Sequence, residues 1–542
     1  MQYTGALGAA FKQAKSRTFF QANDNTIDTT NAVIGLIVAG SLIRIALAGA
    51  VGFGTDESYT VANARYFAWS YVDYPPLHVW LVGAWSWICG SEAPIVLRLP
   101  FIALFAGSTW VMFRLTALLF DDAAGFWAAL LFNLAPVFTL AHASWVLPDG
   151  PLAFLMLSGA FAAARLLFAT DEPSRAMAGW AGTGLLAGLA MLTKFHGVFL
   201  PSAIFAFLLT WRPGRQVLAS PAPWLGAAIA VAVFLPVILW NLHHGGIGLF
   251  FQTKRLTAAP HPSLVRVLGA ILSQSAYLTP WLFVPLATAW IAALARGPSV
   301  PRTWFLALLA SGPIIVFTAA NFVARGLPHW PMPGWLFAFP LLGAEAVRLA
   351  RFRPRFVGYG CAASAGLLLV LVAIFATDGR TGWLANRFPR QYAHLDPTLD
   401  LLNWTELDRA IPERRLIDTA TPAAAAIRWM DAGKLNYAIG RSIPVLCLCS
   451  DPQQFRYLHN PAQFSGRNII VIGTRKDLAD PHTTLLHWFT RVETLAPVTL
   501  HRAGQPAIEL AIVRGVGFKP YGAAFSVVEP HPHAGETIIA RR

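Results

Sequence analysis

Residues 31–51 read NAVIGLIVAGSLIRIALAGAV, the first long apolar run of the chain. A helix needs about 20 predominantly apolar residues to cross the hydrocarbon core of a bilayer, and Arg44 is the only charged residue in this run. The residues before it are polar and contain no cleavage site of the signal-peptide kind, so we expect the run to stay in the membrane as an anchor. The sequence therefore predicts an integral membrane protein.

The composition of the chain supports a membrane location. Of its 542 residues, 56% are hydrophobic and only 13% are charged, whereas about a quarter of the residues are charged in soluble proteins. The chain has a net charge of +14, as expected for a membrane protein whose cytoplasmic loops are rich in Lys and Arg. Because no basic-aromatic motif accompanies this charge, we expect no nucleic-acid partner.

Ten more apolar runs follow the first and predict about eleven transmembrane helices. The predicted spans are residues 31–51, 95–119, 123–142, 150–168, 178–194, 197–211, 223–241, 268–294, 304–322, 331–347 and 356–377. With the N-terminus inside, the inner loops hold about twice as many Lys and Arg as the outer ones, in agreement with the positive-inside rule. We therefore expect a cytoplasmic N-terminus and an outer C-terminus.

This reading divides the chain into three parts. Residues 1–30 form a cytoplasmic segment, residues 31–377 a membrane domain, and residues 378–542 an outer soluble domain in which charges are frequent and apolar runs are short. Apolar runs in the third part predict two buried strands and a helix, at residues 443–449, 468–473 and 422–435. This soluble domain should be of the α/β or α+β class.

The first predicted outer loop, residues 53–94, is rich in polar groups. It holds Asp56 and Glu57 directly after the first span, then Asp73 and Tyr74 before two prolines. The apolar stretch after the prolines predicts a helix lying on the membrane surface. Burying two adjacent carboxylates at the rim of a membrane costs desolvation energy unless they have a cationic partner or a functional role. A solvated acidic loop explains them as well.

Later outer loops add an acid and several cations. Asp149 could be only a helix cap or turn residue, and Lys194 could simply extend to the interface. The other candidates have rings or charges that suit a phosphate, a sugar or an interfacial loop, and they are His196, Lys254, Arg255 and His329. Carboxylates can take a proton from an acceptor while cations hold a phosphate leaving group, so we expect an active site on this face. The sequence identifies no metal or cofactor.

Over residues 31 to about 350, the chain resembles the polyprenyl-phosphate-dependent glycosyltransferases of the C-type fold. That family includes the protein O-mannosyltransferases and the lipid A aminoarabinose transferases. The motifs that recur in the same order are Asp56-Glu57-Ser58-Tyr59, Asp73-Tyr74-Pro75-Pro76-Leu77, Arg98-Leu99-Pro100, Pro148-Asp149, Leu192-Thr193-Lys194-Phe195-His196-Gly197 and His329-Trp330-Pro331.

The resemblance implies an activity and a location. A hexose or pentose would leave a polyprenyl phosphate, with inversion, and join a lipid, glycan or protein acceptor at the outer face of a bacterial inner membrane. By the family pattern, Asp56 would serve as base or orienting group beside the acceptor. Lys194, with Lys254 and Arg255, would hold the donor phosphate.

One departure from the family pattern concerns the sugar. The aminoarabinose transferases carry a basic residue soon after the acidic pair and another just before the two prolines. This chain has Ser58 or Tyr59 at the first place and Tyr74 at the second, which puts aminoarabinose in doubt.

Two other functions fit parts of the sequence. An ion-coupled transporter could use the outer acids and Arg44, but it predicts acids at the midplane of broken, repeated helices, and no internal repeat is visible. A noncatalytic membrane scaffold would present the soluble domain, but it leaves the outer acids and cations without a role.

Overall fold

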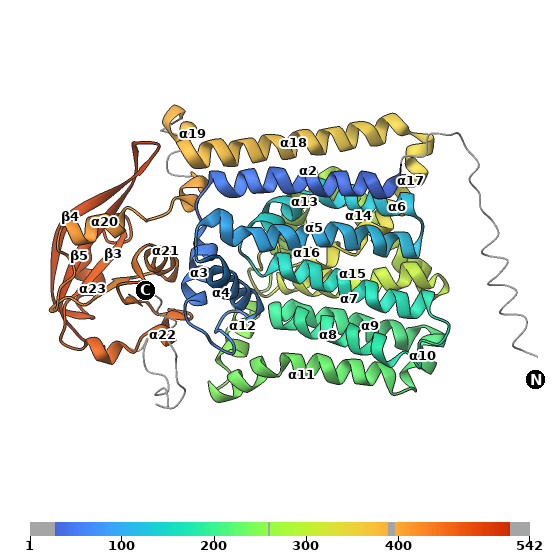
Figure 1. Ribbon diagram of the computed structural model, residues 1–542, viewed down its shortest axis with the longest axis horizontal. Helices are drawn as coiled ribbons and strands as arrows, with labels where there is room; N and C mark the ends of the chain where they lie inside the picture. Colours follow the sequence, from blue (N-terminus) through green and yellow to red (C-terminus); the bar gives the residue numbers. More distant parts are fainter. Residues whose placement is uncertain (1–27, 258–260, 389–395, 521–542) are drawn as a thin grey trace, which may run out of the picture.

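The computed structural model describes residues 28–257, 261–388 and 396–520, without the side chains of residues 254–257. A helical bundle lies at one end of the molecule and a domain with a β-sheet at the other (Figure 1). The predicted fold class, a polytopic helical membrane protein with a C-terminal α/β domain, is confirmed. The predicted cytoplasmic segment, residues 1–30, lies almost entirely outside the described residues.

Six described helices are long and apolar enough to cross a membrane: α2 (Thr29–Ala50), α5 (Pro94–Leu119), α7 (Asp149–Ala169), α11 (Ala222–His243), α15 (Pro301–Ala320) and α18 (Pro354–Thr381). Two sharply bent pairs raise this number to eight: η2 and α9 (Phe195–Thr210) with α10 (Arg212–Leu218), and α13 (Leu264–Leu278) with α14 (Pro280–Arg296) and η3 (Gly297–Ser299). The other predicted spans fall on shorter helices: α6 (Asp122–Leu134), α8 (Met177–Thr193) and α17 (Ala338–Phe352). Eleven spans therefore stay a prediction.

Proline interrupts two of the predicted spans. The run 268–294 is not one helix, because α13 and α14 meet at an angle of 112° at Thr279, whose φ is 70°. The ring of Pro280 disfavours helical backbone at the residue before it. The run 123–142 likewise ends its α-helix at Leu134, before Pro136, and continues as the π-helix η1 (Phe138–His142).

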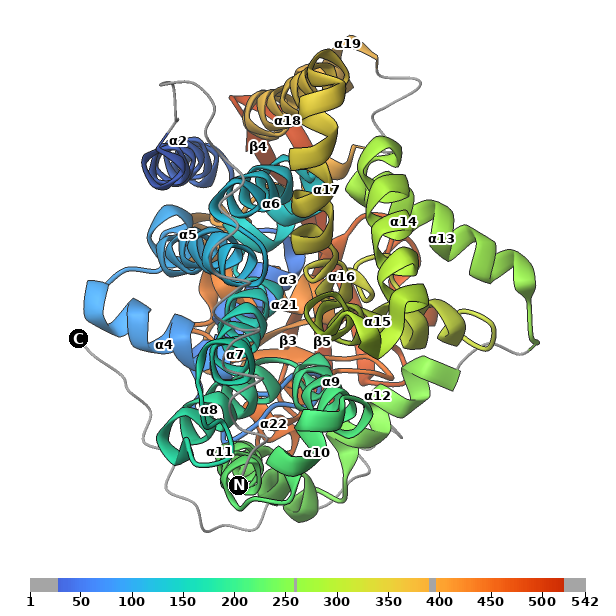
Figure 2. The same cartoon turned by 90° about the vertical axis from the view of Figure 1, so that its right-hand side faces the viewer.

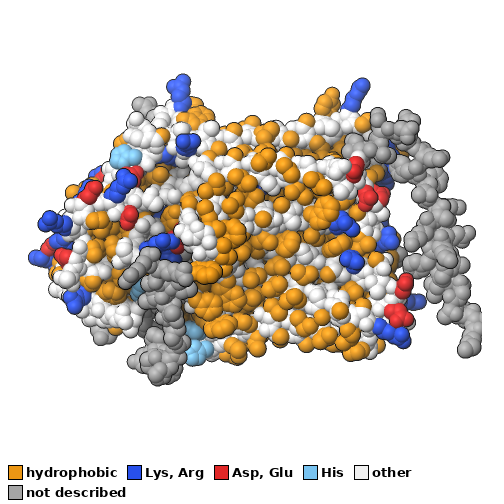
Figure 3. All heavy atoms as spheres, viewed as in Figure 1, with side chains coloured by type: hydrophobic (Ala, Val, Ile, Leu, Met, Phe, Trp, Pro, Cys, Tyr) orange, Lys and Arg blue, Asp and Glu red, His pale blue; other side chains and the backbone are white. Residues whose placement is uncertain are grey.

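The bundle has the surface of a membrane protein. Figure 3 shows hydrophobic side chains covering its middle, with charged side chains gathered at its two ends and on the C-terminal domain. In the view along the bundle, α18 lies at the periphery and α7 near the centre (Figure 2). In agreement with this view, only 6% of the apolar window of α18 is buried, against 61% for α7.

The C-terminal domain contains a five-stranded sheet of order β2-β1-β3-β5-β4. Its strands are β1 (Ala423–Ala426), β2 (Val445–Cys447), β3 (Ile469–Thr474), β4 (Phe489–Arg502) and β5 (Gln505–Phe518). Strand β1 pairs in parallel with β2 and β3, while β5 pairs antiparallel with β3 and β4. The two predicted strands are confirmed as β2 and β3. The predicted boundary at residue 378 falls in the last turn of α18.

The predicted helix 422–435 is wrong in its first half. Ala423–Ala426 form β1, and the helix α21 begins only at Trp429 and ends at Ile439. All four alanines are fully buried between two flanking strands. Burial in a central strand therefore overrides the helix preference of alanine.

Short helices complete the chain: α3 (Thr55–Ala64), α4 (Leu77–Cys89), α12 (Ile247–Thr257), α16 (Met332–Trp335), α19 (Trp383–Arg387), η4 (Pro397–Leu401), α20 (Leu407–Glu413), α22 (Phe455–Leu458), η5 (Pro461–Phe464) and α23 (Pro481–Leu485). The apolar helix α4 occupies the stretch predicted to lie on the membrane surface.

The C-terminal domain docks on the bundle through α3 and α21 (Figure 1). Buried Lys434 donates from Nζ to the backbone oxygens of Phe53, at 2.5 Å, and of Leu402, at 3.2 Å. Burial lowers the pKa of Lys434 to about 8. Arg65, just after α3, donates to the backbone oxygen of Tyr437 and pairs with Glu92 at 2.7 Å. These contacts fix α3 between the two parts of the molecule.

Candidate active site

The carboxylate of Glu57 is buried and fully occupied. Its Oε2 accepts from the backbone N–H of Gly54, at 2.9 Å, and from Arg98, at 2.6 Å. Its Oε1 accepts from Nε of Arg98, at 2.8 Å, and from the backbone N–H of Val146, at 2.9 Å. Four donors therefore occupy the hydrogen-bonding positions of this carboxylate. This arrangement favours a positioning role for Glu57 over the catalytic role expected from the sequence.

Arg98 extends this network to the end of the first span. It donates from Nη1 to the backbone oxygens of Ala48, at 3.1 Å, and Val51, at 3.0 Å, and from Nη2 to that of Gly52, at 2.7 Å. One buried ion pair therefore ties together the end of α2, the first turn of α3 and the segment before α7.

Asp56 differs from its neighbour in exposure. It lies in the first turn of α3 and is exposed, whereas Glu57 is 2% exposed. Because Glu57 binds Val146, the turn that carries Asp56 is fixed to the segment that leads into Asp149. Asp56 is thus the carboxylate of the pair that can meet a substrate.

Asp149 and Lys194 form a second buried ion pair. The Nζ of Lys194 lies 2.9 Å from Oδ1 of Asp149, and both side chains are less than a tenth exposed. Asp149 begins α7, and Lys194 follows the last residue of α8. The close turn after Lys194 requires Gly197, since a Cβ there would lie 2.3 Å from the backbone of Ala190. The two residues predicted from separate loops therefore meet.

Histidines surround this ion pair. Asp149 interacts electrostatically with His142 and His329, and His78 and His196 interact with both members of the pair. The Nε2 of His142 lies 4.0 Å from Oδ1 of Asp149. His196 stacks on Phe317, with ring centroids 4.3 Å apart. Ring nitrogens of His142 and His196 have no hydrogen-bond partner among the described residues.

The loop that carries Asp73 and Tyr74 is held on both sides. The hydroxyl of Tyr59 donates to Oδ1 of Asp73, at 3.0 Å, and accepts from the backbone N–H of Gln454, at 3.0 Å. Burial raises the pKa of Tyr59 well above its ordinary value, so this hydroxyl stays neutral. Gln252 of α12 donates to the backbone oxygen of Asp73, at 2.6 Å. Asp73 is therefore buried in the framework of the site.

Tyr74 connects this loop to the histidines. Its ring lies edge-on to that of His78, with centroids 5.5 Å apart, and His78 in turn interacts with Asp149 and Lys194. Lys254 and Arg255 follow on α12, but their side chains lie outside the described residues. Their predicted role in phosphate binding stays a prediction. Among the described residues, no group of three or more His, Cys, Asp or Glu is arranged to hold a metal.

Arg44, inside the first span, has neutral partners. Its guanidinium donates to Oδ1 of Asn133, at 2.8 Å, and to Oγ1 of Thr139, at 3.1 Å, and lies 4.4 Å from the ring of Phe105. Thr139 belongs to η1, which ends at His142. Arg44 therefore holds the π-helical segment that leads to the site.

Comparisons with known proteins agree with this architecture. Residues 73–240 match the family described as dolichyl-phosphate-mannose-protein mannosyltransferase. The lipid A galacturonosyltransferase RgtD of Rhizobium johnstonii is 25% identical over 315 residues, which make up 56% of this chain and 63% of that protein. The crystal structure of ArnT from Cupriavidus metallidurans bound to undecaprenyl phosphate has a TM-score of 0.60 at 16% identity, and the match covers 88% of this chain and 97% of that one. The family match thus covers residues 73–240, and the fold is shared with ArnT over most of the chain.

The apo structure of the same ArnT gives a TM-score of 0.61 at 14% identity, over 89% of this chain and 98% of that one. At these low identities, the two structures show the fold of the chain and nothing more. The family match over residues 73–240 includes Asp73, Tyr74, Asp149, Lys194 and His196.

The sequence did not predict several residues of the candidate site. His142 stands inside a run that was predicted to span the membrane, and His78 in the stretch that was predicted to lie on the membrane surface. A histidine within such a run is itself a signal of function. The contact between Tyr59 and Gln454 had no signal in the sequence, because it joins positions 395 residues apart.

Proposed function

We propose that this protein transfers a hexose or pentose from a polyprenyl-phosphate donor to a lipid, glycan or protein acceptor of the cell envelope. The observation that carries the proposal is the buried Asp149–Lys194 pair, beside which ring nitrogens of His142 and His196 have no hydrogen-bond partner among the described residues. A buried ammonium ion is well suited to hold an anionic phosphate, and Asp149 holds it in place before the donor arrives. The undecaprenyl phosphate in the ArnT crystal structure supports a donor of this class.

The reaction proceeds as one displacement. A hydroxyl oxygen of the acceptor attacks the anomeric carbon while its proton passes to Asp56. The bond between the anomeric carbon and the phosphate oxygen breaks, and the carrier phosphate leaves with that electron pair. Lys194 stabilises the negative charge on the phosphate. Attack opposite the leaving group inverts the anomeric configuration.

The position of the charged residues argues against the other functions. The acids belong to elements at one end of the bundle, beside the C-terminal domain, whereas a transporter site is expected near the midplane. Arg44, which the transporter reading used, has neutral partners. A noncatalytic scaffold has no need of a buried Asp149–Lys194 ion pair with histidines beside it.

Transfer and donor binding can be tested together with purified protein. The probes are galacturonosyl- and mannosyl-polyprenyl phosphate, chosen from the names of the relatives, with lipid A or an envelope extract as acceptor. We expect transfer from one of these donors, and Lys194→Ala should raise the donor KM about 10- to 100-fold, the value of one charge-assisted hydrogen bond. Product formation is followed by mass spectrometry.

Two further variants make this test specific. Lys476→Ala removes an exposed lysine of the C-terminal domain and should leave the KM unchanged. The double variant Asp149→Asn, Lys194→Met removes both charges, so it leaves no buried charge unpaired, and it should still bind donor weakly. No transfer from any lipid-phosphate sugar would contradict the function. Transfer with a normal KM in Lys194→Ala would contradict only the role of Lys194.

We propose that the protein lies in a bacterial inner membrane with its N-terminus in the cytoplasm and the site outside. In a background in which the four cysteines are replaced by Ser, an impermeant maleimide should label Ser450→Cys in intact spheroplasts. Phe352→Cys, an exposed position at the other end of the bundle, should be labelled only after permeabilisation. The reverse pattern would overturn the orientation.

A further inference from the structure

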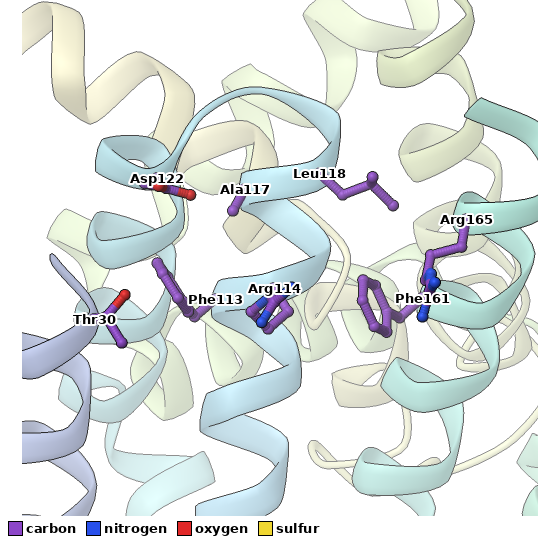
Figure 4. Close-up of a pocket in the computed structure, with 8 residues that line it drawn as sticks. All are labelled: Thr30, Phe113, Arg114, Ala117, Leu118, Asp122, Phe161 and Arg165. Carbon is purple, nitrogen blue, oxygen red and sulfur yellow. The ribbon is translucent and has the colours of Figure 1, made fainter. Parts of the chain in front are cut away.

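A cavity of about 490 Å³, whose lining is drawn in Figure 4, lies at the end of the bundle away from the C-terminal domain. It opens where α2 begins and where α5 and α7 end. The charged residues in its lining are Arg114 of α5, Arg165 of α7 and Asp122 of α6. None of the site residues described above lines this cavity, so it is a separate feature of the molecule.

The charges in this cavity are exposed and available. Among the residues that the structure describes, no hydrogen bond or ion pair engages the side chains of Arg114, Arg165 or Asp122. Arg114 only lies over the ring of Trp110, at 5.7 Å. In Figure 4, Arg114 stands between Asp122 and Thr30 on one side and Phe161 and Arg165 on the other. The cavity therefore has a strongly cationic part and a part that contains a carboxylate.

The two arginines lie at a depth that suits a lipid headgroup. Arg114 and Arg165 lie within two turns of the ends of α5 and α7, about 6 to 8 Å along each helix axis. The rings of Phe113 and Phe161 also line the cavity, so apolar surface continues beside the charges. A ligand with a charged head and an apolar body fits this arrangement better than a free anion does.

We propose that this cavity binds the headgroup of a zwitterionic phospholipid with a primary amine. The phosphate lies between Arg114 and Arg165, since guanidinium groups pair with phosphate oxygens by two parallel hydrogen bonds. Basic pockets between membrane helices on the cytoplasmic side recognise lipid headgroups in this way. The ammonium group donates to Asp122, which disfavours lipids whose headgroup is only anionic. Phe113 and Phe161 contact the glycerol and the upper acyl chains.

Lipid retention by the full chain tests this proposal. The purified protein is depleted of lipid and then given equal amounts of phosphatidylethanolamine, phosphatidylglycerol and phosphatidylcholine. The bound lipid is then counted by native mass spectrometry. We expect preferential retention of the ethanolamine lipid, and Arg114→Gln with Arg165→Gln should reduce it about tenfold. Asp122→Asn should shift the preference toward phosphatidylglycerol.

Matched controls keep the outcome clear. Arg175→Gln and Glu172→Gln alter an exposed ion pair in the loop after α7 and should leave retention unchanged. Retention of the ethanolamine lipid that is equal in the wild type and the Arg114, Arg165 double variant would overturn the site. A wild-type preference for phosphatidylglycerol would overturn the role of Asp122, and displacement of the lipid by inorganic phosphate alone would show a simple anion site.

Discussion

Replacing Asp56 by Asn should lower turnover by about 10²- to 10⁴-fold, the rate enhancement that a general base usually contributes. A hydroxyl is a weak nucleophile at neutral pH, so loss of the base slows attack on the sugar. Asn keeps the size and shape of the side chain, and Asp56 is exposed, so the fold and the donor KM should change little. Single-turnover transfer at saturating donor measures the effect directly.

The control for this variant is another exposed aspartate. Asp408→Asn, in α20 of the C-terminal domain, removes the same charge far from the bundle ion pairs and should keep normal turnover. If Asp56→Asn also kept normal turnover, Asp56 would not be the base. Asp149, which is paired with Lys194, would then be the next acid to replace.

Replacing Arg98 by Met should destabilise the protein by about 3 to 5 kcal/mol, the usual cost of breaking a buried ion pair from one side. Arg98 is 1% exposed, and its removal leaves the Glu57 carboxylate buried without its cation. Three backbone oxygens near the end of α2 also lose their donor. Unfolding in detergent, followed by temperature or denaturant, measures the loss.

A double variant separates charge from shape in this experiment. Glu57→Gln combined with Arg98→Met removes both charges and should recover part of the lost stability. Arg409→Met, at an exposed position of α20, is the surface control. If Arg98→Met unfolded no more readily than Arg409→Met, the ion pair would not hold the site together.

The sequence predicted the fold class and several members of the candidate site, because both depend on local patterns. Long apolar runs identify membrane helices wherever they occur, and Asp149 and Lys194 attracted attention as charges between such runs. The structure then placed them 2.9 Å apart. The two loops were predicted to lie on the same side of the membrane, which is consistent with this contact.

Other features depend on contacts that no local pattern contains. Asp56 and Glu57 are adjacent acids in the sequence, yet only Glu57 meets Arg98, which belongs to another helix. The alanines of β1 favour a helix on their own and become a strand because two other strands flank them. The helix breaks at Thr279 and Leu134 lie next to prolines in the sequence. The apolar runs nevertheless predicted one continuous span at each place.

The docking of α3 on the C-terminal domain also has a consequence for biosynthesis. Arg65 binds Asn436, which is made 371 residues later. At about 5 to 20 residues per second, the ribosome needs on the order of 20 to 70 s to supply that partner. Until then, the helix that carries Asp56 lacks its packing against α21. A chain that stops short of Asn436 has the membrane helices that the structure describes, but it lacks the packing that holds α3, so we expect transfer only after the C-terminal domain has been made.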